Sequence, residues 1–244
     1  MIYKCTMIIL IPAVGKGERF KRSKYKVPKP NIQVDGIPML VRSAKSLGFV
    51  GTYIFLIREN EFRDDLVKEI YKEFPKAKIG VVSSDTEGAA STALIAEEFL
   101  SNKEELIIVN CDQVMDTLSW NADLVLKQLR KYDAGLVTIN SEDSKHSYAR
   151  IQDNFVVEVL EKDVISNVAL TGIHYWKQAS DFVISAKNMI SNGRRSFNGE
   201  FYIGPTYNEL IKTGKKVGIC MIPNHAIHFI GTPDDLERYE SRNA

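Results

Sequence analysis

The feature that most constrains the fold is a short apolar, β-branched run that enters a glycine-containing loop near the N-terminus. Residues 8–13 read IILIPA, and Gly15 and Gly17 follow directly. A short continuous apolar run of this kind predicts a strand buried in a sheet. The two glycines let the backbone approach a bulky ligand and turn its N–H groups toward it. The segment therefore predicts a buried strand that ends in an anion-binding loop.

Two cations follow this loop. Arg19 comes two residues after Gly17, and Lys29 stands between Pro28 and Pro30. A glycine loop with converging positive charges suits a polyphosphate. The common phosphate motifs do not match: the chain has no G-x-x-x-x-G-K-[ST], and Phe20 replaces the third glycine of G-x-G-x-x-G. Alone, the two glycines are also consistent with an ordinary turn.

Composition limits the class of protein. The 244 residues are 44% hydrophobic and carry a net charge of +1, which is ordinary for a globular α/β chain and gives no support for nucleic-acid binding. We expect neither a membrane-spanning helix nor a signal peptide. Three scattered cysteines, Cys5, Cys111 and Cys220, indicate a reducing compartment and no zinc site. The expected location is the cytoplasm.

The first half alternates strands and helices. We predict strands at residues 7–13, 52–57, 78–82 and 105–109, and helices at residues 39–48, 64–74 and 91–100. This alternation predicts a mixed, largely parallel sheet flanked by helices, as in Rossmann-like folds. Ligands bind at the carboxyl ends of the strands in such sheets. The glycine loop and Asp112 both follow predicted strands, so we expect them at the same edge.

The second half is more mixed and predicts a small β-region. We expect a hairpin that turns at Asp153-Asn154, between strands at 148–151 and 155–160. Further strands are predicted at 169–176 and 217–222, and helices at 179–192, at 205–213 and after Thr232. We treat the chain as one domain, with a nucleotide-binding half at 1–140 and an acceptor-binding half at 141–244.

Asp112 is the most informative single residue. A carboxylate at the end of a buried strand is costly unless it is solvated, paired or bound to a metal. It would suit Mg²⁺, which takes one or two carboxylates together with phosphate oxygens and water. A turn or helix-cap aspartate is the alternative. We assign that simpler role to Asp116.

The pattern G-x-G-x-R-F-(x)7-P-K-P after a buried strand resembles the signature of the sugar-phosphate nucleotidylyltransferases (pyrophosphorylases) and the related cytidylyltransferases. The resemblance implies that Arg19 and Lys29 contact the phosphates of an NTP during transfer, and that Asp112 binds the catalytic Mg²⁺. It also implies a nucleotide site formed by Ala13, Gly15, Gly17, Glu87 and Gly88. Without the resemblance, residues 86–91 would be an ordinary strand-to-helix loop.

The resemblance extends, more thinly, to the C-terminal half. It implies an acceptor site formed by Glu161, Lys162, Thr171, Gly172 and Glu200. From charge alone, Glu161 and Lys162 would be ordinary surface residues. The family pattern fails at one place: many members have an aspartate shortly before Gly-Thr as a second metal ligand, whereas here His228-Phe229-Ile230 precede Gly231-Thr232. The absence of an acid at Ile230 leaves the second metal ligand open.

We therefore predict a nucleotidyltransferase that joins an NTP to a phosphorylated small molecule, releasing pyrophosphate. The first expectation for the acceptor is a sugar phosphate of a surface-polysaccharide pathway. Three alternatives stay open: a cytidylyltransferase for a non-sugar phosphate, a glycosyltransferase of similar fold, and a non-catalytic nucleotide-binding regulator. A glycosyltransferase would usually show Asp-x-Asp, where this chain has Cys111-Asp112-Gln113.

Overall fold

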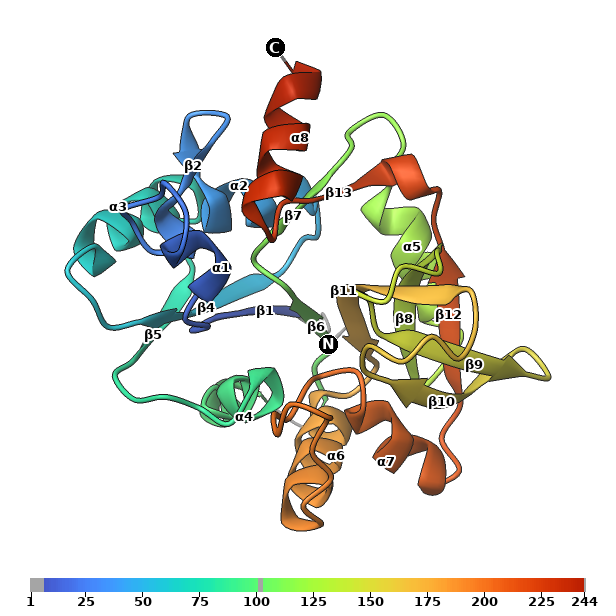
Figure 1. The fold of residues 1–244 in the computed structure, drawn as a ribbon. Helices are drawn as coiled ribbons and strands as arrows, with labels where there is room; N and C mark the ends of the chain where they lie inside the picture. The colour runs from blue at the N-terminus through green and yellow to red at the C-terminus, as the bar shows by residue number, and fades with distance from the viewer. Residues whose placement is uncertain (1–6, 101–102, 244) are drawn as a thin grey trace, which may run out of the picture.

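A nine-stranded mixed sheet forms the centre of the molecule (Figure 1). The computed structural model describes residues 7–100 and 103–243. The main path of the sheet runs in the order β10-β9-β11-β6-β1-β4-β5, and β8 joins β11 to β12. The strands on this path are β10 (Phe155–Leu160), β9 (Tyr148–Gln152), β11 (Val168–Trp176), β6 (Leu106–Val109), β1 (Ile8–Ala13), β4 (Thr52–Arg58) and β5 (Lys78–Val82). The two remaining strands are β8 (Ala134–Asn140) and β12 (Val217–Met221).

Four strands of the first half pair in parallel, and β12 of the second half also pairs in parallel with β8. β1 pairs in parallel with β4 and β6, and β4 with β5. The predicted mixed, largely parallel sheet flanked by helices is confirmed. Strands of the second half extend this same sheet, because β11 pairs antiparallel with β6. The hairpin between β9 and β10 is also confirmed: Asp153 and Asn154 have φ values of 51° and 66°, as a two-residue type I′ turn requires.

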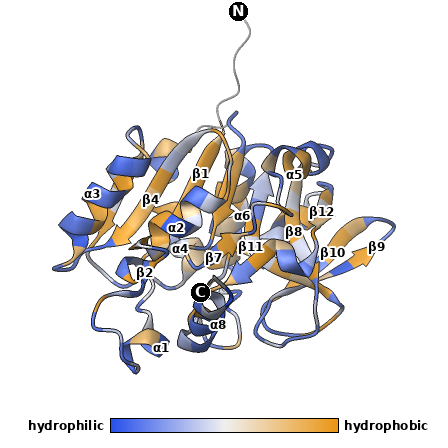
Figure 2. Ribbon diagram, turned by 90° about the horizontal axis from the view of Figure 1, so that it is seen from above, coloured by the Kyte–Doolittle hydropathy of each residue, from blue (hydrophilic) through white to orange (hydrophobic). Residues whose placement is uncertain are grey.

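The apolar run in β1 is continuous because the sheet is covered on both faces. Ile8 and Leu10 belong to one buried cluster, whereas Ile9 and Ile11 belong to another. The first cluster lies under α4 (Ala89–Leu94), α6 (Ala179–Ser191) and α7 (Thr206–Lys212). The second lies under α2 (Met39–Ser46), α3 (Arg63–Glu73) and α5 (Ala122–Leu129). Figure 2 shows the hydrophobic strands between helices of more polar character.

The helix predicted at residues 91–100 is wrong in its bounds. α4 begins at Ala89, and the 3-10 helix η2 (Glu97–Phe99) follows it. The backbone N–H of Ile95 donates to Thr92 at 3.0 Å, so the hydrogen bonds tighten to a three-residue spacing. The helix starts early because the N–H of Ala90 bonds to the carbonyl of Phe201 at 2.9 Å, a contact from a distant segment.

A third buried cluster supports the loops at the carboxyl edge of the sheet. It joins residues of the N-terminal loops to α8 (Pro233–Asn243): Phe20, Ile32, Val34, Met39, Val114, Ile230, Leu236 and Tyr239. The helix predicted after Thr232 is α8, and Thr232 caps it, since its hydroxyl accepts from the N–H of Asp235 at 3.1 Å. The short strands β7 (Gln113–Met115) and β13 (Ile227–Phe229) pair antiparallel beside this cluster. The small strands β2 (Gln33–Val34) and β3 (Ile37–Pro38) complete the region.

Among the residues that the structure describes, no helix is long and apolar enough to cross a bilayer. Cys111 and Cys220 are unpaired there, while Cys5 lies outside the described residues. Burial raises the pKa of the Cys111 thiol to about 11, so this thiol is protonated at neutral pH.

Candidate active site at the carboxyl edge of the sheet

The glycine loop follows β1 and turns directly against Lys29. Gly17 has a φ of 63° and precedes the short helix α1 (Glu18–Lys21). A β-carbon added at Gly17 would lie 3.0 Å from the β-carbon of Lys29, which belongs to the 3-10 helix η1 (Lys29–Asn31). At Gly15, by contrast, an added β-carbon would meet no atom within 4 Å. Gly17 therefore provides a left-handed turn and a close approach of the loop backbone to Lys29, and the loop is open to solvent at Gly15.

Lys29 and Asp112 form an ion pair at the centre of this edge. The Nζ atom of Lys29 donates to Oδ2 of Asp112, and the two side chains are 15% and 24% exposed. Burial is the largest single effect and acts to lower the pKa of Lys29, but the charge of Asp112, the nearby Cys111 and the hydrogen bond to Asp112 together raise the pKa above its ordinary value. The ammonium is therefore charged at neutral pH. Because β1 and β6 are neighbours, the loops that follow them meet here, as the sequence predicted.

Arg19 reaches the same region from α1. Its side chain is exposed, and its positive charge acts to lower the pKa of Lys29, as the smallest of the effects on that group. The structure thus pairs Lys29 with Asp112 and adds the charge of Arg19 from the helix that follows the glycine loop. Two cations beside one carboxylate leave a net positive charge, which attracts an anion.

The segment that precedes α8 also contacts Asp112. The N–H of Ile230 donates to the backbone carbonyl of Asp112 at 2.9 Å. A β-carbon added at Gly231 would lie 2.6 Å from Oδ2 of Asp112. Ile230 itself is fully buried in the cluster under α8. Ile230, which stands where the family pattern has an acid, is therefore a residue of the hydrophobic core.

The nucleotide loop at residues 86–90 is joined to a segment of the second half. Gly88 has a φ of 129°, and a β-carbon there would lie 2.5 Å from the carbonyl oxygen of Phe201. The N–H of Phe201 donates to the carbonyl of Glu87 at 2.8 Å. The close approach of the Phe201 backbone is therefore by itself a reason for glycine at residue 88, whether or not a ligand binds there. The sequence did not indicate this contact.

The predicted acceptor residues lie in three places in the second half: after β10, within β11, and, for Glu200, in the loop between α6 and α7. Glu161 follows β10, and its carboxylate accepts a hydrogen bond from the hydroxyl of Ser147. Burial raises the pKa of Glu161, although Ser147 and Lys162 act in the opposite direction. Lys162 has a φ of 56° and extends over the rings of Phe197 and Tyr202.

Thr171 and Gly172 are held within β11. The hydroxyl of Thr171 donates to the carbonyl of Val137 at 2.9 Å, and the residue is buried. Gly172 has a φ of 84°, and the side-chain nitrogen of Asn110 lies 2.2 Å from where its β-carbon would be. This glycine therefore makes room for a side chain from the loop of Asp112. The side-chain amide of Gln113 is buried nearby without a hydrogen-bond partner among the described residues.

The sequence reasoning missed an ion cluster that braces the glycine loop. Asp85 contacts Lys16 at 2.6 Å and Arg58 at 2.9 Å. The Nε of Arg58 also donates to the carbonyl of Val14 at 2.8 Å. Arg58 is the last residue of β4, so the rule that places ligand sites at the carboxyl ends of strands would have indicated it.

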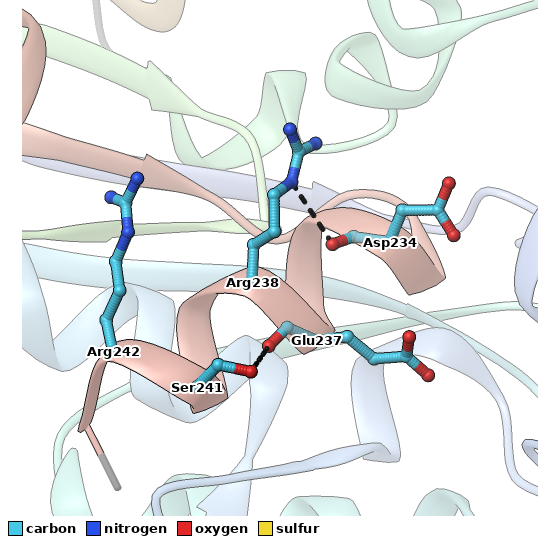
Figure 3. A pocket seen from close by; sticks show the side chains of 5 residues that line it. All are labelled: Asp234, Glu237, Arg238, Ser241 and Arg242. Atoms are coloured by element: carbon cyan, nitrogen blue, oxygen red, sulfur yellow. Dashed lines mark hydrogen bonds between the residues drawn. The ribbon is translucent and has the colours of Figure 1, made fainter.

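No cluster of three or more metal-ligating side chains occurs in the part of the chain that the structure describes. Asp112 offers one carboxylate, which is a donor set that suits a cation held largely by nucleotide phosphates and water. A shallow pocket lies on α8 (Figure 3). Its lining residues come from one helix and include none of the predicted site residues: Asp234, Glu237, Arg238, Ser241 and Arg242.

Known proteins of similar sequence cover nearly the whole chain. The bifunctional protein GlmU of Methanococcus aeolicus is 25% identical over 235 residues, which is 94% of this chain. The chain spans about half the length of that relative, 53%. The UTP–glucose-1-phosphate uridylyltransferase AglF of Haloferax volcanii is 24% identical over 247 residues, covering 97% of this chain and 96% of that protein. No family model matches the chain.

The fold has counterparts among solved structures. The nucleoside-diphosphate-sugar pyrophosphorylase from Vibrio cholerae RC9 superposes with a TM-score of 0.83 at 22% identity, covering 95% of this chain and 98% of that one. This similarity confirms the fold predicted from the sequence. The sequence similarity to GlmU and AglF supports the predicted family, the sugar-phosphate nucleotidyltransferases.

Proposed function

We propose that this protein transfers a nucleotidyl group from an NTP to the phosphate of a small acceptor, with a sugar phosphate as the first candidate. The observation that carries the proposal is the Lys29–Asp112 ion pair beside the glycine loop, at the shared carboxyl edge of β1 and β6. The names of AglF, a UTP–glucose-1-phosphate uridylyltransferase, and of the Vibrio cholerae nucleoside-diphosphate-sugar pyrophosphorylase support the same reaction class. Residues 1–140 would bind the nucleotide and residues 141–244 the acceptor.

The chemistry needs no protein nucleophile. An oxygen of the acceptor phosphate attacks the α-phosphorus, a new phosphoanhydride bond forms, and the bond from the α-phosphorus to the bridging β-oxygen breaks. Pyrophosphate leaves with that bond's electron pair. The protein's tasks are to align the reactants and to offset the charge that develops. Arg19 and Lys29 supply the positive charge, and the open backbone at Gly15 supplies space for the phosphates.

Asp112 would hold a Mg²⁺ ion, which supplies further neutralisation of phosphate charge when it is bound. Because Asp112 is the one carboxylate that we place at this site, we expect weak metal binding without nucleotide. In the acceptor half, the backbone around Gly172 and the carboxylates of Glu161 and Glu200 would receive the acceptor, and Lys162 its phosphate. The hydroxyl of Thr171 is already bonded inside the sheet, so we assign only its backbone to acceptor binding.

We place the reaction in the cytoplasm, where NTPs are available, and its product in surface-polysaccharide synthesis. A pyrophosphate-release screen tests the proposal: four NTPs with Mg²⁺ against a panel of sugar phosphates and non-sugar phosphates. Release that requires an acceptor phosphate supports the transferase, and the preferred acceptor separates the sugar and cytidylyltransferase alternatives. Transfer from a nucleotide sugar without pyrophosphate release would favour a glycosyltransferase. Binding without turnover would favour a regulator.

A further inference from the structure

The nucleotide loop and a loop of the acceptor half form one connected unit. We define the nucleotide loop as residues 86–90 and the acceptor loop as residues 193–202, which connects α6 to α7. Two backbone hydrogen bonds join them: Phe201 N–H to Glu87 O at 2.8 Å, and Ala90 N–H to Phe201 O at 2.9 Å. The two loops are more than 100 residues apart in sequence. A displacement of either loop therefore acts on the other.

One side chain, Arg195, contacts both loops. Its Nη2 lies 2.5 Å from a carboxylate oxygen of Glu87, and its Nη1 donates to the carbonyl of Gly199 at 2.8 Å. Its guanidinium lies 4.2 Å from the ring centroid of Phe201. Arg195 is 41% exposed and Glu87 58%, so the ion pair alone adds little to stability. Its planar guanidinium instead fixes the relative positions of three groups.

The acceptor loop also contacts the lysine expected to receive the acceptor phosphate. The Nζ of Lys162 lies 5.5 Å from the ring centroid of Phe197 and 5.7 Å from that of Tyr202. Within the loop, Asn198 donates to Glu200 at 3.0 Å and to the hydroxyl of Tyr202 at 2.8 Å. The position of this loop therefore influences both Lys162 and Glu200.

We propose that Arg195 is a positioning residue that couples nucleotide binding to acceptor binding. This inference rests on the proposed function, because it takes Glu87 and Gly88 to be at the nucleotide and Lys162 and Glu200 to be at the acceptor. A nucleotide that fixes Glu87 fixes Arg195, and through it the acceptor loop. Coupling of this kind is reciprocal and typically changes affinity by about 5–150-fold.

Calorimetric titration measures the coupling directly. The probes are glucose 1-phosphate and the non-hydrolysable α,β-methylene analogue of UTP, with Mg²⁺ present. For the wild type we expect the analogue to tighten glucose 1-phosphate binding by about fivefold or more. In Arg195→Met the factor should fall close to one. The matched control is Arg194→Met, because Arg194 pairs with Glu209 of α7 and not with the nucleotide loop; it should keep the wild-type factor.

A double variant that exchanges the two charges of the ion pair distinguishes loss of the pair from local unfolding. The double variant Glu87→Arg/Arg195→Glu re-forms the pair in the opposite sense and should recover part of the coupling that Arg195→Met loses. Unchanged coupling in Arg195→Met would overturn the inference, as would a wild type that binds both probes without coupling; either result would leave the proposed function standing. A wild type that binds neither probe would count against the proposed function, and the inference would fall with it.

Discussion

Replacing Lys29 with methionine should separate its catalytic charge from its packing, because methionine keeps an unbranched apolar side chain and removes only the ammonium. Removing one preorganised contact to developing charge typically lowers turnover by about 10²–10³-fold. We therefore expect a loss of kcat in this range, measured as pyrophosphate release at saturating NTP and acceptor.

The same substitution should also lower stability, because it leaves Asp112 without its ion-pair partner. The pair is partly buried, with side chains 15% and 24% exposed, so its loss falls between the cost for a surface pair and that for a buried one. We expect a decrease of about 1–2 kcal/mol in the free energy of unfolding. For a chain of this size that corresponds to a fall of roughly 2–8 °C in Tm.

The control is Lys26→Met, which removes an exposed charge from the same segment and should change neither quantity. Adding Asp112→Asn to Lys29→Met should cost less stability than the two single losses summed, because no unpaired charge is left. Near-normal turnover in Lys29→Met would refute the catalytic assignment. A fall in Tm far beyond this range would show that Lys29 is chiefly structural.

Three further substitutions test other parts of the site. Gly88→Val should lower Tm and weaken both nucleotide and acceptor binding in calorimetry, since its side chain would press on the Phe201 backbone; selective loss of nucleotide binding would contradict this. Asp112→Asn should abolish the Mg²⁺-dependent gain in NTP affinity while circular dichroism stays native, and an unchanged Mg²⁺ dependence would move the metal elsewhere. Burial raises the pKa of Glu161, so the folded protein binds a proton at this carboxyl group more tightly than the unfolded chain does. The stability that this proton adds is lost as the pH rises through the raised pKa. Glu161→Gln should therefore gain Tm relative to wild type as pH rises from about 4 to 7, and a parallel pair of Tm curves would count against a raised pKa.

Local patterns were sufficient to predict much of the fold. The IILIPA run indicated a buried strand because each residue in β1 faces one of two covered sides of the sheet. Asp153-Asn154 indicated the hairpin because the turn needs positive φ at both residues. Asp112 and the glycine loop were predicted to share an edge because parallel neighbours end at the same side.

Contacts between segments that are distant in sequence could not be predicted from local sequence patterns. The pairing of β7 with β13 joins segments more than 100 residues apart, and no property of Gln113–Met115 alone indicates it. The early start of α4 depends on Phe201, which packs against it from the second half. The bridge from Arg195 to Glu87 has the same origin, because neither residue carries a local signal for the other.

The central claim is that an acceptor phosphate attacks the α-phosphorus of an NTP, and isotope labelling tests it most directly. Glucose 1-phosphate with ¹⁸O at the three non-bridging phosphate oxygens is incubated with UTP, Mg²⁺ and the protein, and both products are measured by mass spectrometry. We predict a nucleoside-diphosphate sugar that retains all three labelled oxygens, formed in equal amount to unlabelled pyrophosphate. Pyrophosphate without a labelled sugar nucleotide, or label in the pyrophosphate, would contradict the account.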